Sequence, residues 1–127
     1  MTYSLKNKNI ILCVCGGIAA YKSVELLRLL SRQEAIVKVL MTRNSLSFVG
    51  KLTFEALSGF KVCTSLFESS DDASISHIAL ADEADAVIIA PATANIIGKF
   101  ANGIADDAVS TFLLAATSSI LVCPSMN

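Results

Sequence analysis

The sequence contains no apolar run that approaches the ~18 residues needed to cross a lipid bilayer, although 54% of its 127 residues are hydrophobic. The clearest apolar runs, at 10–15 and 86–90, have the length of a strand. The N-terminal stretch MTYSLKNKN also lacks the apolar segment and the small-residue cleavage site of a secretion signal. We therefore expect a cytoplasmic protein without membrane contact, whose apolar excess is buried in a sheet covered on both faces and in subunit contacts.

Charged side chains are also scarce, at 17% of the chain. This composition excludes a disordered protein, and 127 residues suffice for one domain with a single core. The net charge of −1 conceals an uneven distribution: residues 1–63 carry nine Lys or Arg and three acids (+6), whereas residues 64–127 carry one Lys and eight acids (−7). The basic residues form no run and do not alternate with aromatics, so we expect no nucleic-acid binding. An anionic ligand near the N-terminal half is compatible with the charge.

Metal ligands are few, because His77 is the single histidine and the four cysteines form no C-x-x-C pair. Zinc sites use clusters of these residue types, and we therefore expect no metal site. A disulfide is not expected in a cytoplasmic protein. We predict that Cys13, Cys63 and Cys123 are buried structural thiols, whereas Cys15 adjoins a glycine pair and its role stays open.

Apolar segments of strand length alternate with amphipathic segments of helix length along the chain. This alternation predicts an α/β fold, a doubly wound parallel sheet with right-handed crossovers. In such sheets the ligand lies beyond the carboxyl ends of the strands, where the winding direction switches. For the common strand order 3-2-1-4-5, the loops after the first and the fourth strand border that crevice. The predicted strands are 9–15, 36–41, 61–64 (a short edge strand), 86–90 and 119–123, and the predicted helices are 19–32, 52–58, 76–84, a segment after 95 that reaches 101, and 106–116.

The loop after the first strand joins it to a helix through Gly16 and Gly17. Glycine lets a ligand approach the backbone, and free N–H groups at the start of a helix attract phosphate. The loop matches neither G-x-G-x-x-G nor a Walker motif, and a tight turn used only for packing is the alternative. Thr42 ends the second strand, where its hydroxyl either reaches the same phosphate or caps a turn.

The loop after the fourth strand reads PATAN and begins with a proline that is expected to end the strand, at residues 91–95. Its small residues leave room for a flat ring, to which Thr93 and Asn95 offer hydrogen bonds. A helix N-cap with packing alanines is the alternative. His77 carries the only side chain with an ordinary pKa near neutrality, and it is either a proton-transfer group or a structural or exposed histidine.

Four segments in this order resemble the flavin-containing cysteine decarboxylases: GGIAAYKSVELLRLL, LTFEALSG, SHIALADEADAVIIAPATANIIGKFANGIADDAVST and LVCPSMN. The resemblance implies a single Rossmann-like flavoprotein domain of three αβα layers over residues 1–127, with FMN as its cofactor. The family's P-A-S-A-N-T motif departs here at Thr93, which keeps the hydroxyl, and at Ile96, which removes one. The residues that the resemblance assigns to FMN are Gly16, Gly17, Ile18, Ala19, Ser23, Thr42, Phe48, Pro91, Ala92, Thr93, Ala94 and Asn95.

The resemblance also implies roles for the remaining motif residues. His77, in the H-I-x-L pattern, matches the family's active-site histidine. Asn127, which follows Met126 in the P-x-M-N pattern, matches the residue that recognises the substrate carboxylate, and both are expected to bind substrate. Family members continue into a flap with an active-site cysteine, and we expect this domain to lack that flap because the sequence stops at Asn127.

The implied activity is FMN-dependent decarboxylation of 4′-phosphopantothenoylcysteine to 4′-phosphopantetheine in coenzyme A biosynthesis. Oxidation of the cysteine side chain to a thioaldehyde places the carboxylate β to a thiocarbonyl, which allows CO₂ to leave. Two alternatives stay open: decarboxylation of a C-terminal cysteine in a peptide, and a flavin-binding or regulatory subunit without turnover. The implied partners are copies of the same chain, in a trimer or a dodecamer, and a CTP-dependent phosphopantothenate–cysteine ligase.

Overall fold

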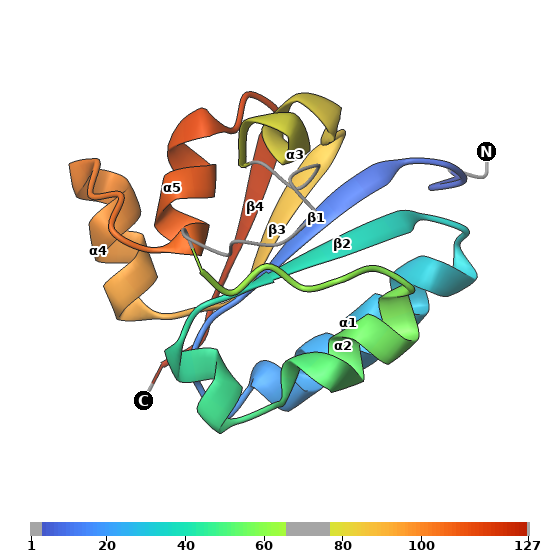
Figure 1. Cartoon of the computed structure of the whole chain (residues 1–127), viewed down its shortest axis with the longest axis horizontal. Coiled ribbons are helices and arrows are strands. Elements are labelled where there is room, and N and C mark those ends of the chain that lie inside the picture. The colour runs from blue at the N-terminus through green and yellow to red at the C-terminus, as the bar shows by residue number, and fades with distance from the viewer. Residues whose placement is uncertain (1–3, 66–76, 127) are drawn as a thin grey trace.

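The computed structural model describes residues 4–65 and 77–126, which form four strands, five α-helices and one 3-10 helix. Each helix predicted from the sequence is present, and so is each predicted strand except 61–64, with ends shifted by two residues at most. The 3-10 helix was not predicted. The elements in chain order are β1 (Asn9–Val14), α1 (Ala20–Arg32), β2 (Ile36–Met41), η1 (Asn44–Ser47), α2 (Lys51–Ser58), α3 (His77–Glu83), β3 (Ala86–Ala92), α4 (Ala94–Asn102), α5 (Ala108–Ala115) and β4 (Ser119–Pro124) (Figure 1).

The four strands are parallel and lie in the order β2-β1-β3-β4. The predicted edge strand at 61–64 is reduced to one parallel bridge between Leu40 and Cys63. Because this bridge lies on the outer side of β2, it completes the predicted strand order 3-2-1-4-5. The winding direction therefore switches between β1 and β3, as predicted.

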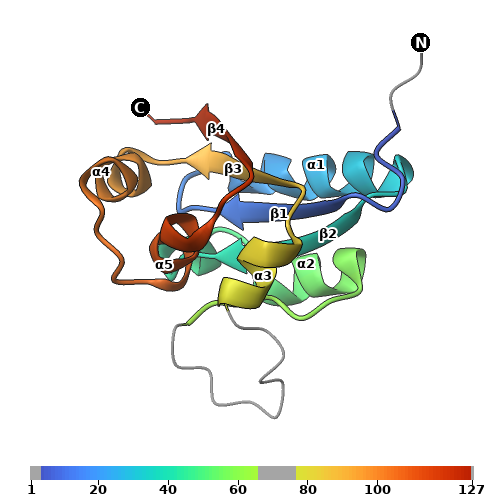
Figure 2. The same cartoon turned by 90° about the horizontal axis from the view of Figure 1, so that it is seen from above.

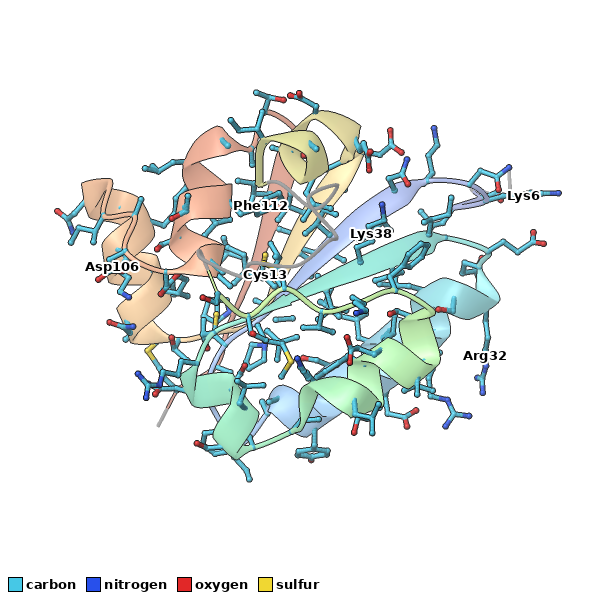
Figure 3. All side chains as sticks on the ribbon, in the orientation of Figure 1. Lys6, Cys13, Arg32, Lys38, Asp106 and Phe112 are labelled. Carbon is cyan, nitrogen blue, oxygen red and sulfur yellow. The ribbon has the colours of Figure 1, made fainter. Side chains whose placement is uncertain are left out.

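Helices cover both faces of the sheet, with α1 and α2 on one side and α3 and α5 on the other (Figure 1). The first face holds a buried cluster that includes Leu12, Leu27 and Phe54. The second face holds a cluster that includes Cys13 and Phe112, both labelled between α5 and the sheet in Figure 3. The predicted three-layer αβα arrangement is confirmed.

Burial along each strand follows its place in the sheet. β1 is central and is buried from Ile10 to Val14, because helices cover both of its faces. β4 is an edge strand, where Leu121 is 59% exposed and Cys123 is half-buried. The prediction of a buried thiol is therefore wrong for Cys123, which is only half-buried, and it is confirmed for Cys13 and Cys63.

The prediction that Pro91 ends its strand is also wrong, because β3 continues to Ala92. Proline has no N–H to donate, and a shift of register between Ile89 and Ala92 accommodates it within the ladder. The Ala90–Pro91 peptide bond is cis. The loop that follows this strand therefore begins two residues later than the sequence indicated.

Local signals set the helix ends. α2 and α4 end at Gly59 and Gly103, whose left-handed φ angles of 80° and 68° suit glycine. α5 begins after Asp107, whose side chain forms a capping box with Ser110. Within residues 4–65 and 77–126, no helix has the length and apolar character needed to cross a membrane.

Candidate functional site

Four loops meet at the carboxyl end of the sheet. Figure 2 shows the strand arrowheads pointing toward the end of the molecule at which the C-terminus lies, so the loops after all four strands leave from one edge. The segments that follow the strands comprise residues 15–19, 42–48, 93–95, of which 94 and 95 begin α4, and 125–126. The residues predicted to contact FMN lie in these loops or directly beside them, with Ser23 in the first turn of α1.

Backbone hydrogen bonds fix the loop after β3 between its neighbours. The N–H of Cys15 donates to the carbonyl of Pro91 at 3.3 Å, on the side of β1. The N–H of Ser125 donates to the carbonyl of Ala92 at 3.0 Å, on the side of β4. The start of α4 is thereby held between the first glycine loop and the segment that carries Met126.

The two glycines of that loop have different surroundings. A Cβ atom on Gly16 would lie 2.6 Å from the Cβ of Asn44 and 2.9 Å from its carbonyl carbon. Close packing against η1 therefore explains Gly16. A Cβ atom on Gly17 would meet no protein atom within 4 Å. The packing alternative leaves Gly17 unexplained, and the open space beside it lets a ligand reach the backbone.

The start of α1 offers backbone donors to an anion. Ala19 is its N-cap, no side chain caps it, and its first turn contains no acidic residue. Within the described part of the chain, no group accepts a hydrogen bond from the N–H of Gly17, Ile18 or Ala19. A phosphate group at this position would receive these donors and lie at the positive end of the helix dipole.

Thr42 links the end of β2 to η1. Its backbone N–H donates to the carbonyl of Val14 at 3.0 Å. Its Oγ1 accepts a hydrogen bond from the N–H of Ser45 at 3.3 Å, and the Ser45 hydroxyl donates to the Thr42 carbonyl at 2.6 Å. The capping role is present, and it uses the hydroxyl as an acceptor, which leaves the hydroxyl proton for a ligand.

Thr93 is arranged in the same way at the start of α4. Its Oγ1 accepts from the N–H of Ile96 at 3.3 Å and so caps the helix. Ala94 and Asn95 follow in the exposed first turn, while Pro91 and Ala92 are buried beneath them. The N-cap alternative is thus realised together with an exposed amide and small side chains beside the glycine loop.

Ser23 has a structural hydrogen bond. The residue is 3% exposed, and its hydroxyl donates to the carbonyl of Ala90 at 2.5 Å, which joins α1 to β3. A contact between Ser23 and FMN stays a prediction, and only the oxygen lone pairs remain for it.

Cys15 lies beneath the two loops with 1% of its surface exposed. The pKa of its thiol is raised to about 12, mainly by burial and to a smaller extent by the charge of Asp107, against the opposing effects of the Thr93 backbone N–H and the Lys99 charge. The thiol is therefore protonated at neutral pH, and Cys15 is not a ready nucleophile.

Apolar side chains are exposed around this edge. Ile18 is 71% exposed, Met126 57% and Phe48 48%. His77 is the first residue of α3. The side chain of His77 and the whole of Asn127 lie outside the described residues, so their roles stay predictions.

Sequence reasoning missed two features of this edge. Asn44 presses against Gly16, and Ser45 bonds to Thr42, because the unpredicted 3-10 helix brings them there. The pair formed by Lys99 and Asp107, at 2.9 Å, was also missed. Their spacing of eight residues across a helix break gives no periodic signal, although Asn102-Gly103 marks the break.

Comparison with known proteins gives a consistent picture. The sequence model of the family described as Flavoprotein matches residues 1–127. The chain is 53% identical over 123 residues to the coenzyme A biosynthesis bifunctional protein CoaBC of Bacillus subtilis, and 46% identical over 124 residues to that of Escherichia coli. These matches cover 97% and 98% of the chain, which spans 30% of the length of each of the two relatives.

Two solved structures have a similar fold. The FMN-dependent cysteine decarboxylase SpaF superposes with a TM-score of 0.87 at 29% identity, over 98% of this chain and 71% of SpaF. A mutant PPC decarboxylase complexed with pantothenoylaminoethenethiol superposes with a TM-score of 0.77 at 28% identity, over 96% of this chain and 69% of that one. The similarity includes the whole sheet and the loops at its carboxyl edge.

Proposed function

Because this chain belongs to the Flavoprotein family, we propose that it binds FMN and decarboxylates 4′-phosphopantothenoylcysteine to 4′-phosphopantetheine in coenzyme A biosynthesis. The observation that carries the proposal is the open backbone at Gly17, at the start of a helix without a cap. The relatives support the substrate, since CoaBC is named for coenzyme A biosynthesis and the PPC decarboxylase structure holds pantothenoylaminoethenethiol.

The residues at the carboxyl edge fit FMN. The N–H groups of residues 17–19 suit its phosphate, and the Thr42 hydroxyl, which is used only as an acceptor within the described residues, keeps a proton to donate to the same ligand from the neighbouring loop. The small residues 91–95 leave room for the flat ring, with Asn95 as a hydrogen-bonding partner. The exposed ring of Phe48 offers an apolar wall.

The chemistry that bound FMN would supply is the removal of two electrons from the cysteine CH₂–SH to give a thioaldehyde, whose carboxylate lies β to a thiocarbonyl and leaves as CO₂, and the return of the same two electrons to the resulting enethiol to give the saturated thiol. We assign proton transfer to His77, whose ordinary pKa lies near neutrality. Asn127 holds the substrate carboxylate and Met126 lies beside it. The buried, protonated Cys15 takes no part as a nucleophile.

We also propose two kinds of partner. The bifunctional relatives point to a CTP-dependent phosphopantothenate–cysteine ligase, which makes the substrate of this step. A homo-oligomer, as a trimer or a dodecamer, accounts for large exposed apolar side chains such as Leu52 at 73% and Leu114 at 54%.

The test has a binding arm and a turnover arm. Titration of the chain with FMN and with riboflavin, followed by flavin fluorescence, measures the contribution of the phosphate. We expect FMN to bind more tightly, because riboflavin lacks the phosphate that the glycine loop holds. Equal affinity, or no binding of either, would contradict the proposed site.

Turnover is followed as CO₂ release and by mass spectrometry of the product. We expect 4′-phosphopantothenoylcysteine to react and a peptide that ends in cysteine to remain unchanged. The opposite preference would establish the peptide alternative, and FMN binding without turnover of either substrate would favour a flavin-binding subunit.

A further inference from the structure

Lys99 of α4 forms ion pairs with two adjacent carboxylates at the start of α5. Its Nζ lies 2.8 Å from Oδ1 of Asp106 and 2.9 Å from Oδ2 of Asp107. The Lys99 and Asp107 side chains are 18% and 27% exposed, whereas the Asp106 side chain is 61% exposed and lies at the corner between α4 and α5 (Figure 3). The pair with Asp107 is therefore the more shielded from solvent.

Asp107 serves two helices at once. Its Oδ2 pairs with Lys99 of α4, while its Oδ1 accepts from the backbone N–H of Ser110 at 2.7 Å and from the Ser110 hydroxyl at 2.8 Å. Desolvation alone would raise the pKa of Asp107, but the hydrogen bonds from Lys99 and Ser110 outweigh it and hold this pKa below its usual value. The carboxylate is consequently charged at neutral pH and bonded through both oxygens.

The ion pair is linked to the two loops of the proposed FMN site through Cys15 and the core beneath them. The charges of both Lys99 and Asp107 act on the Cys15 thiol, which the backbone N–H of Thr93 also faces. One buried cluster contains Cys15 and Ala92 together with Ile96 of α4 and Ala108 of α5. The Cys15 N–H in turn donates to the carbonyl of Pro91. A shift of α4 relative to α5 would therefore be transmitted to the spacing between residues 15–19 and 91–95.

We propose that Lys99 and Asp107 are positioning residues, whose ion pair sets the place of α4 and of residues 91–95 against the first glycine loop. This inference rests on the proposed function, because it concerns the same FMN site. Groups that hold ligand-contacting residues in place contribute about 10- to 100-fold to affinity at metal sites. We expect loss of this pair to weaken FMN binding by about tenfold for the same reason.

Four variants separate positioning from general stability. Lys99→Met and Asp107→Asn each remove the ion pair, and the asparagine keeps an oxygen that can cap α5. Ser110→Ala is the matched structural control, because it weakens the α5 cap while both charges stay. Lys99→Arg is the conservative variant that keeps the positive charge.

The measurements are the FMN dissociation constant, the flavin absorption bands in the bound state and the apo melting temperature of each chain. We expect Lys99→Met and Asp107→Asn to raise the dissociation constant and to alter the flavin bands. We expect Lys99→Arg to keep a dissociation constant and flavin bands close to those of the wild-type chain. Ser110→Ala should lower the melting temperature without changing either flavin readout.

Two results would overturn the inference alone: wild-type affinity in both Lys99→Met and Asp107→Asn, or an equal loss of affinity in Ser110→Ala. If only one of the two charge variants folds, the FMN affinity of that variant alone tests the inference. A wild-type chain that binds no FMN would instead overturn the proposed function, and this inference with it.

Discussion

Gly16 and Asn44 touch so closely that position 16 has no space for a side chain, since a Cβ there would lie 2.6 Å from the Asn44 Cβ. The neighbouring Gly17 has no such contact. The two adjacent glycines of one loop therefore have separate functions: Gly16 allows the loop to pack on η1, and Gly17 leaves the backbone open to a ligand.

Alanine at each of these positions should give opposite readouts. Gly17→Ala should keep the free energy of unfolding of the apo chain but lower FMN affinity, because the methyl group occupies the space beside the phosphate donors. Gly16→Ala should cost about 1–3 kcal/mol of stability through overpacking. Urea denaturation and fluorescence titration with FMN measure the two effects. If Gly17→Ala bound FMN with wild-type affinity, the phosphate could not be placed at this loop.

Ser23→Ala should destabilise the chain by about 1–3 kcal/mol, because the buried Ala90 carbonyl loses its donor. Ser31→Ala, on the exposed side of the same helix, is the control and should change stability by less than about 0.5 kcal/mol. Thermal denaturation of the apo chains measures both. FMN titration of Ser23→Ala then tests its predicted cofactor contact, which requires a loss of affinity beyond that of the control.

The Cys15 thiol should make stability fall at alkaline pH. Its pKa is raised from 9.0 to about 12 in the folded chain, so the folded chain keeps a proton that the unfolded chain loses between these values. Because the folded state binds more protons there, the free energy of unfolding decreases as the pH rises through this window and is unaffected by Cys15 below it.

Urea denaturation at a series of pH values from neutral to alkaline measures this slope. Cys15→Ser removes the titrating thiol and should flatten the slope, although it also removes the Cys15 charge that helps to raise the pKa of the buried Cys13. Parallel slopes for the two chains would show that Cys15 is not desolvated in solution.

The glycine inside α4 and the glycine that caps its C-terminal end should change stability in opposite directions when replaced by alanine. Gly98 is inside the helix with no atom within 4 Å of an added Cβ, so Gly98→Ala should stabilise the chain by about 1 kcal/mol. Gly103 has a left-handed φ of 68°, so Gly103→Ala should destabilise it by about 1 kcal/mol. Chemical denaturation measures both. If both variants changed the free energy of unfolding equally, α4 would not end at Asn102.

The sequence allowed the sheet, its strand order and the two loops of the site to be predicted, because continuous apolar strands and a glycine pair at a strand end are local patterns. It did not allow the register shift at Pro91 to be predicted, since that depends on the partner strands β1 and β4. The contact between Gly16 and Asn44 was missed for a related reason. It joins residues far apart in sequence, and no periodicity marks it.

The hydroxyl groups of Thr42 and Thr93 also show what the sequence alone does not decide. Thr42 and Thr93 were each left with two interpretations, a cap or a ligand contact, and in the structure each caps a turn or helix as an acceptor while its proton remains for a ligand. The two interpretations were therefore compatible. A residue type alone does not distinguish which half of a hydroxyl is in use.

The pairing of β1 with β3 has a consequence for the order of events during synthesis of this chain. At the start of this pairing, the backbone N–H of Asn9 donates to the carboxylate of Asp85, the residue directly before β3, across 76 residues of sequence. The glycine loop leaves the ribosome long before the strand that completes its pocket, and closing so long a loop delays the contact further. The residues of the proposed FMN site are therefore brought together only after the second half of the sheet has been made, and we expect FMN to bind late in folding and not to act as a template for its early steps.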